Sequence, residues 1–227
     1  MRIGLCLLLL FTLLVEADPV QADTVAMPFS FAAVAAQKNY VFVMIAPVAK
    51  GSDGSNLRDE ERGAAQRLRA RYRTSGLYAN DGSTTPLWTV DWYANSVLVP
   101  SDGIHLIRRG PWAENGSTEA LTFFAEGRKI RSYSVGELVD TTLTLPHTVS
   151  HFSWDKSITI DEASRTATVT TLNGDRYVID FTNGGIISAS RPMRIAAITI
   201  AGLLLFVTAF FISRKGRPGV LDLPPSS

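Results

Sequence analysis

The chain has 227 residues, of which 22 are Lys or Arg and 21 are Asp or Glu, so its formal net charge is +1. This balance provides neither the basic excess of a nucleic-acid-binding protein nor the acidic block of a solvating tail. The sequence contains one cysteine, Cys6, which excludes a disulfide framework within the chain. We therefore expect no nucleic-acid partner and a domain stabilised by core packing.

Residues 1–22 have the layout of a secretory signal peptide. Arg2 provides a positive start, residues 3–15 form an apolar core, and Val20-Gln21-Ala22 is the small-residue pattern that precedes cleavage, here before Asp23. Cys6 lies early in the apolar core, which is the wrong place for lipid attachment, so it would leave with the signal peptide. An uncleaved N-terminal anchor is the alternative.

A second apolar segment lies near the C-terminus, where residues 195–212 contain no charged side chain. At about 1.5 Å per residue this run reaches about 27 Å, close to the hydrocarbon thickness of about 30 Å. Basic residues follow at once, which indicates a cytoplasmic C-terminus. We expect a transmembrane helix over residues 194–213 and a cytoplasmic tail over 214–227.

Residues 23–193 are then an extracytoplasmic domain on a single-pass membrane protein, with the membrane itself as one partner. The length suits one domain with a sizeable core. Without Cys6 the exported part has no cysteine at all. Exported domains without disulfides are commoner in bacterial envelopes than on eukaryotic cell surfaces, so we expect the bacterial cell envelope.

One helix is predicted near the start of this domain, at residues 57–73, with Asn56 as its cap. Acidic residues fill its first turn and arginines its last turn, an arrangement that stabilises a helix through its dipole. Gly76 lies just beyond and would stop the helix. The preceding apolar run, residues 40–45, predicts a buried strand.

From Leu87 onward almost every segment predicts a strand, in two series at residues 87–133 and 150–188. Residues 97–102 correspond to 158–163, and 123–127 to 180–184, as in an imperfect internal repeat. Such a period resembles the blades of β-propellers, although chance similarity between β-meanders would give the same pattern. We expect a mostly β domain, either an antiparallel β-sandwich or a propeller-blade-like fold, with one N-terminal helix.

Catalytic and metal-binding motifs are hard to find in this sequence. His147 and His151 have the spacing of two metal ligands on a helix face, but Pro146 precedes them and no Cys or Glu completes a site. Ser153 and Lys156 have the Ser-x-x-Lys spacing of some acyl-transfer enzymes, but that geometry needs a helix where a strand is predicted. We expect no metal site and no cofactor, and no catalytic residue can be named.

Aromatic side chains are dense in the β series, and most share a face with aliphatic residues, which indicates core packing. Tyr93 and Trp112 are the exceptions, because Tyr93 lies on a mixed face and Trp112 in a loop. Exposed aromatic rings beside an acid, such as Asp91, can bind sugars by stacking. Asp91, Tyr93 and Trp112 are therefore the candidate binding residues.

Two functions remain open. The favoured one is a membrane-tethered binding or scaffold module for a protein or glycan outside the cytoplasm. The alternative is a membrane-anchored extracytoplasmic enzyme, a hydrolase, whose site forms only in three dimensions. A polar cleft with clustered acids or a histidine pair would favour the enzyme, whereas a flat face of exposed aromatic residues would favour the binding module.

Overall fold

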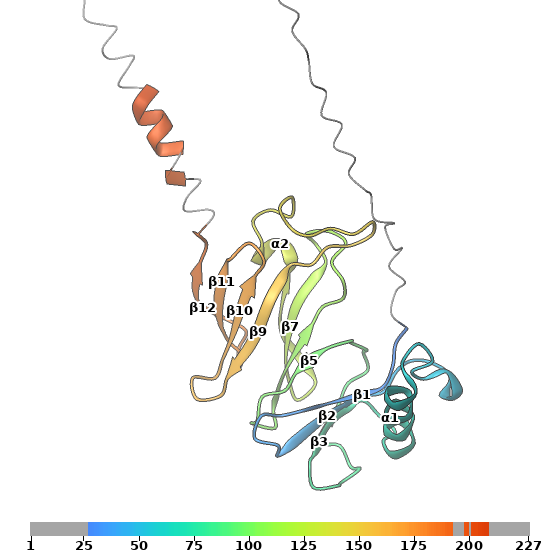
Figure 1. The fold of residues 1–227 in the computed structure, drawn as a ribbon. Coiled ribbons are helices and arrows are strands. Elements are labelled where there is room, and N and C mark those ends of the chain that lie inside the picture. Colours follow the sequence, from blue (N-terminus) through green and yellow to red (C-terminus); the bar gives the residue numbers. More distant parts are fainter. Residues whose placement is uncertain (1–26, 193–197, 200, 209–227) are drawn as a thin grey trace, which may run out of the picture.

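The computed structural model describes residues 27–192, 198–199 and 201–208, and within them the protein is mostly β (Figure 1). Three antiparallel sheets, each of four strands, follow one another along the chain. The expectation of an antiparallel, β-rich fold is therefore confirmed. The predicted signal peptide, residues 1–22, lies outside the described residues. Within the described part of the chain, no helix is both long and apolar enough to cross a bilayer.

Sheet 1 is formed by the N-terminal part of the domain. Its strands pair in sequence order, each antiparallel to the next. They are β1 (Phe31–Val34), β2 (Tyr40–Met44), β3 (Gly76–Ala79) and β4 (Trp88–Thr89). A short 3-10 helix (Lys50–Ser52) and the helix α1 (Asp59–Arg71) are inserted between β2 and β3.

Sheets 2 and 3 repeat this up-and-down order. Sheet 2 contains β5 (Val97–Leu98), β6 (His105–Arg109), β7 (Glu119–Ala125) and β8 (Arg128–Ser134). The short helix α2 (Val135–Leu138) follows, opened by a capping box between Ser134 and Glu137. Sheet 3 contains β9 (Asp155–Asp161), β10 (Thr166–Thr171), β11 (Arg176–Asp180) and β12 (Ile186–Ser190).

Helix α1 covers the outer face of sheet 1. It begins at Asp59 after Arg58, and no side chain caps it, so the predicted cap at Asn56 is wrong. The dipole pattern compensates, because acids fill its first turn and Arg69 and Arg71 lie in its last. Leu68 and the buried ring of Tyr72 pack against one face of sheet 1 in a small cluster with Val41, Val43 and Tyr78.

Sheet 2 is the middle layer of the domain, because both of its faces are buried. Successive side chains in a strand point to opposite faces. Phe124 of β7 packs in a cluster with Phe42 of sheet 1, whereas the preceding Phe123 packs in a cluster with Val169 of sheet 3. The three sheets therefore form a three-layer stack rather than a two-sheet sandwich.

The outer face of sheet 3 explains why the stack stops there. On β10, Ala167 and Val169 are buried against sheet 2, so Thr168 and Thr170 point the other way and are half-buried. Their partners on β9 are the exposed Thr159 and Ser157. This hydroxyl-rich face needs no further apolar sheet, so the described residues form an open stack.

The two pairs of segments that correspond in the sequence occupy matching places in sheets 2 and 3. The turn between β7 and β8 contains Gly127, and the turn between β11 and β12 contains Gly184, both with positive φ (75° and 71°). Each glycine presses on the last strand of the preceding sheet, Gly127 on Thr89 of β4 and Gly184 on Arg131 of β8. Sheet 1 has the same strand order, but α1 is inserted between β2 and β3, so the correspondence was not visible in the sequence.

Candidate functional site

A cleft of about 370 Å³, lined by both apolar and polar side chains, opens where β6 ends. Its walls come from the segment before β5, from the end of β6 with the following loop, and from the start of β7. The lining residues are Tyr93, Ala94, Asn95, Arg108, Arg109, Gly110, Pro111 and Glu119. A volume of this size falls within the range of small-molecule sites, roughly 300–1,000 Å³.

Two arginine–carboxylate forks define the chemistry of this cleft. Arg108 donates to Glu119 from Nε (2.9 Å) and Nη2 (2.7 Å), and Arg109 donates to Asp155 from Nε (2.9 Å) and Nη2 (2.6 Å). Such bidentate pairs hold both partners in fixed orientations. The cleft therefore presents firmly placed donors and acceptors with no net charge from these four groups.

Two aromatic rings of the core contact the guanidinium of Arg108, which belongs to the Arg108–Glu119 fork. The Arg108 guanidinium lies 4.7 Å from the centre of the Trp92 ring and 5.3 Å from that of Phe124. The two rings are themselves 4.8 Å apart in the core between sheets 1 and 2. The site is thus built directly on the packed core, which keeps Arg108 in place without a ligand.

The structure separates the three candidate residues of the sequence. Tyr93 lines the cleft, and its hydroxyl donates to the Phe29 carbonyl (3.1 Å) and accepts from the Phe29 N–H (3.0 Å). Burial raises the pKa of Tyr93 and the Asp53 charge raises it further, against the opposing Phe29 N–H. Trp112 follows the lining residue Pro111 but stacks on His151, with ring centres 4.2 Å apart. Asp91 is exposed and is not part of the cleft wall.

The remaining sequence motifs do not come together as sites. His147 donates from Nε2 to the Thr142 carbonyl (2.7 Å), whereas His151 stacks on Trp112. Ser153 is not helical, and Lys156 lies in β9, so the geometry of a serine–lysine pair one helical turn apart is missing. No group of three or more metal-ligating side chains occurs among the described residues.

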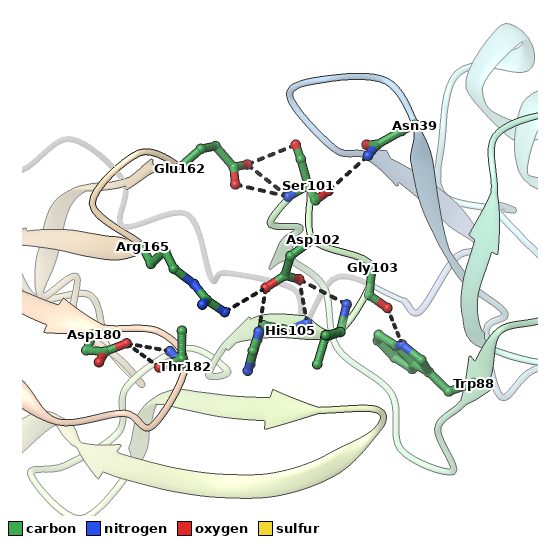
Figure 2. A network of polar contacts seen from close by, with 11 residues as sticks. Asn39, Trp88, Ser101, Asp102, Gly103, His105, Glu162, Arg165, Asp180 and Thr182 are labelled. Carbon is green, nitrogen blue, oxygen red and sulfur yellow. Dashed lines mark hydrogen bonds and ion pairs between the residues drawn. The ribbon is translucent and has the colours of Figure 1, made fainter.

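A second polar cluster joins three turns at the other end of the stack (Figure 2). Ser101, in the turn between β5 and β6, donates from its N–H (2.9 Å) and Oγ (3.0 Å) to Glu162 in the β9–β10 turn. Its carbonyl accepts from Asn39 Nδ2 (2.9 Å) and its Oγ from the Gln37 N–H (3.1 Å), both in the β1–β2 turn. The first turn of every sheet thus meets at Ser101.

This cluster includes a histidine–aspartate pair, which invites comparison with a catalytic dyad. Asp102 Oδ2 lies 2.5 Å from His105 Nδ1, and its Oδ1 accepts the N–H groups of Ile104 and His105. Burial alone would raise the pKa of Asp102, but these hydrogen bonds outweigh it and lower the pKa. The Ser101 hydroxyl donates to Glu162, and no contact found among the described residues joins it to His105. The arrangement holds the sheets together and lacks an activated nucleophile.

The sequence named Tyr93, which lines this cleft, as a candidate binding residue, but it did not reveal either arginine–carboxylate fork. Arg108 and Glu119 sit on neighbouring strands, and Arg109 and Asp155 are 46 positions apart. The consecutive arginines at the end of a predicted strand were the available signal, but their partners appear only once the sheets are stacked. No protein-family model matches the chain, and no curated protein matches it significantly.

Proposed function

We propose that the protein is a membrane-tethered, noncatalytic module that binds a polyhydroxylated ligand, a glycan, outside the cytoplasm. The cleft between Tyr93 and the two arginine forks is the binding site. The observation that carries this proposal is that both arginines lining the cleft are already neutralised by carboxylates. The fixed donors and acceptors suit hydroxyl groups, whereas an anionic ligand would have to compete with Glu119 and Asp155.

Pocket shape and aromatic content support a sugar-sized ligand. Tyr93 contributes a half-buried aromatic ring to the cleft lining; its hydroxyl is held by Phe29, and part of the ring packs on the core between sheets 1 and 2. Sugar rings have an apolar C–H face and a rim of hydroxyls. In the proposed complex Tyr93 contacts the apolar face, and the arginine–carboxylate forks bind the hydroxyls. Asn95 adds an exposed amide at the edge, with one acceptor and two donors.

The enzyme alternative is less well supported by the same features. Glu119, the acid that lines the cleft, is paired with Arg108, and Asp155 is paired with Arg109, so no unpaired acids cluster there. Neither histidine of the predicted pair lines the cleft. The flat face of exposed aromatic rings expected for a binding module is also missing from residues 27–192, where Trp112 is the exposed large aromatic side chain. We therefore prefer the binding module to the enzyme on two observations. Each arginine of the cleft is neutralised by a carboxylate, and the Ser101 hydroxyl already donates to Glu162.

Binding can be tested with the full chain in detergent on an array of bacterial and host oligosaccharides. Asn95→Trp should fill the cleft from its exposed edge and abolish the signal, because the new ring occupies ligand volume without touching the core. Thr84→Trp, at an exposed position in the β3–β4 loop, is the matched control and should bind like the parent. Equal binding by all three proteins would overturn the cleft as the site.

The same ligands distinguish the binding module from the hydrolase. Each oligosaccharide that binds is incubated with the protein and then examined by mass spectrometry. The proposed function predicts intact ligand after prolonged incubation. Cleavage products that disappear in Asn95→Trp would show that the cleft belongs to an enzyme.

The proposed C-terminal membrane anchor and the cleaved signal peptide are tested in separate experiments. The chain should remain with membranes after alkaline washing, and truncation after Arg191 should release a folded, secreted β domain. N-terminal sequencing should find the mature start near Asp23. A truncated chain that stays with membranes would contradict the C-terminal anchor.

A further inference from the structure

The connection between α2 and β9, which we call the tip loop (residues 139–154), has an unusual surface. Leu143 is 90% exposed and Val149 is 80% exposed, more than any other large hydrophobic residue in the described part of the chain. From residue 141 to residue 154 the sequence contains no Asp, Glu, Lys or Arg. Beyond Asp140 the tip loop is therefore an uncharged surface with two outward aliphatic side chains.

The two exposed side chains belong to an ordered loop. Leu145 and Phe152 are buried in the core between sheets 2 and 3 and hold the loop at two points. The Thr148 N–H donates to the His151 carbonyl (2.7 Å), and Asn173 Nδ2 donates to the Thr141 carbonyl (3.0 Å). Because neighbours on both sides are fixed, the fold presents Leu143 and Val149 outward instead of burying them.

Trp112 extends the same surface. Its ring is 42% exposed and stacks on His151 of the tip loop, with the centres 4.2 Å apart. A backbone bridge between Ala113 and Phe152 joins the two loops at this point. Tryptophan is enriched where proteins meet the membrane–water interface, because its ring is apolar and its N–H can stay hydrated.

The position of Arg191 ties the tip loop to the C-terminal apolar segment. Arg191 follows β12 and donates from Nη1 to Asp140 Oδ1 (2.9 Å) and from Nη2 to the Glu137 carbonyl (3.2 Å), at the foot of the loop. Only four peptide units separate Arg191 from Ile195, which limits their Cα distance to about 14 Å. The end of β12 and the loop after α2 lie at the same end of the molecule (Figure 1).

From these contacts we propose that the tip loop and Trp112 rest on the lipid bilayer, with Leu143 and Val149 inserted among the headgroups. The proposal rests on the tether proposed above, because the apolar segment starting at Ile195 brings the bilayer to the foot of the loop. Neutral loops with outward aliphatic and Trp side chains enter the interface without desolvating a charge. The Asp140 carboxylate at the loop's foot is paired with Arg191.

This seating fixes the orientation of the whole domain. The Ser101 junction lies at the opposite end of the sheet stack and would face away from the membrane, whereas the cleft opens beside the loop that carries Trp112. A ligand would then be bound close to the membrane surface. A flexible stalk would leave the orientation free, so the two arrangements differ in a measurable way.

The experiment places one environment-sensitive fluorophore on the full chain in phosphatidylcholine vesicles, with and without lipids that carry a quenching nitroxide near the headgroups. Cys6→Ser provides the background, and Leu143→Cys and Val149→Cys provide the labelling sites. Leu87→Cys, an exposed leucine before β4, is the matched control. Vesicle flotation after alkaline washing shows separately whether the chain is anchored.

We expect blue-shifted emission at positions 143 and 149, with about half of it or more lost to the nitroxide lipid, and water-like, unquenched emission at position 87. If the protein is anchored but the labels at 143 and 149 show water-like, unquenched emission, the tip loop does not contact the bilayer. That result overturns this proposal but does not contradict the C-terminal tether. Blue-shifted emission without quenching shows that protein, either a second copy or another chain, covers the loop, and also overturns it. Protein that fails to float with vesicles overturns the tether, and the seating with it.

Discussion

The Glu162 carboxylate accepts hydrogen bonds from both the backbone N–H and the hydroxyl of Ser101, 61 positions away in the chain. The two residues occupy the same turn in successive sheets, between the first and second strands. Ser101 also accepts hydrogen bonds from the corresponding turn of sheet 1. Apolar side chains pack the faces of the three sheets together, and this junction fixes how the sheets align at one end.

Replacing Glu162 by Ala should lower the free energy of unfolding by about 1–3 kcal/mol, because the nearly buried Ser101 N–H loses a charged acceptor. Glu162→Gln should cost less, since its amide oxygen can still accept. Urea denaturation monitored by circular dichroism measures both. Glu114→Ala, at an exposed loop position, is the control and should stay within about 0.5 kcal/mol of the parent.

The Arg109–Asp155 fork should behave as a bridge between sheets 2 and 3. The Asp155 side chain is 9% exposed, so its loss leaves Arg109 without a partner beside the core. A double-mutant cycle with Arg109→Ala and Asp155→Ala should give a coupling free energy of about 1 kcal/mol or more. The exposed Arg58–Glu61 pair on α1 provides the control cycle, which should show no measurable coupling. Equal coupling in both cycles would contradict the bridging role.

Asp175 should make the protein less stable as the pH rises. Burial raises the pKa of this carboxyl, the Asp140 charge raises it further, and Arg191 offsets this only in part. A folded-state pKa above the unfolded value of about 3.9 means that the native state binds the proton more tightly, so stability falls as pH rises through the interval between them. Oδ1 of Asp175 is buried and has no partner among the described residues.

Asp175→Asn tests this directly, because the amide is nearly isosteric and cannot ionise. The variant should be more stable than the parent at neutral pH and should lose the decline in stability above about pH 4. Urea denaturation at several pH values gives the two curves. Parallel curves would show that Asp175 does not cause the decline.

Local sequence patterns predicted the β-rich class, but they did not predict strands whose formation depends on pairing with residues far away in the sequence. The helix was placed at 57–73 and is found at Asp59–Arg71, because its charges mark both ends. The strands β1 and β3 were missed, since each has only four residues and Gly76 resembled a helix stop. Their strand character depends on pairing with β2 on both of its sides.

The site was less predictable than the fold for a related reason. The sequence singled out Tyr93 on the mixed face of a predicted strand, whereas the structure places Tyr93 in the connection between β4 and β5. No local pattern distinguishes a paired arginine from a solvated one. Asp155, the partner of Arg109, lay in a segment whose only recognised feature was a Ser-x-x-Lys spacing. Asp91 stood out in the sequence as an acid beside aromatic residues, yet it is exposed and does not line the cleft.

Gly127 and Gly184 provide a test of whether sheets 2 and 3 dock on their preceding sheets in the same way. A Cβ on Gly127 would lie 2.4 Å from the Thr89 carbonyl oxygen, and one on Gly184 would lie 2.6 Å from Arg131 Cβ. Both residues also have positive φ, which penalises any side chain. Each Gly→Ala substitution should therefore cost about 2 kcal/mol or more in unfolding free energy.

Gly82→Ala separates the two causes, because Gly82 has φ of +94° but its nearest neighbour would be the flexible end of Arg71, 3.6 Å away. That substitution should cost only the backbone strain, about 1 kcal/mol. Chemical denaturation of the three variants gives the comparison. If Gly127→Ala and Gly184→Ala lose no more stability than Gly82→Ala, the turns do not press on the preceding sheets, and the matched docking is wrong. A similar loss of unfolding free energy at both turns, larger than that of Gly82→Ala, would show that sheets 2 and 3 each pack on the preceding sheet through the same turn.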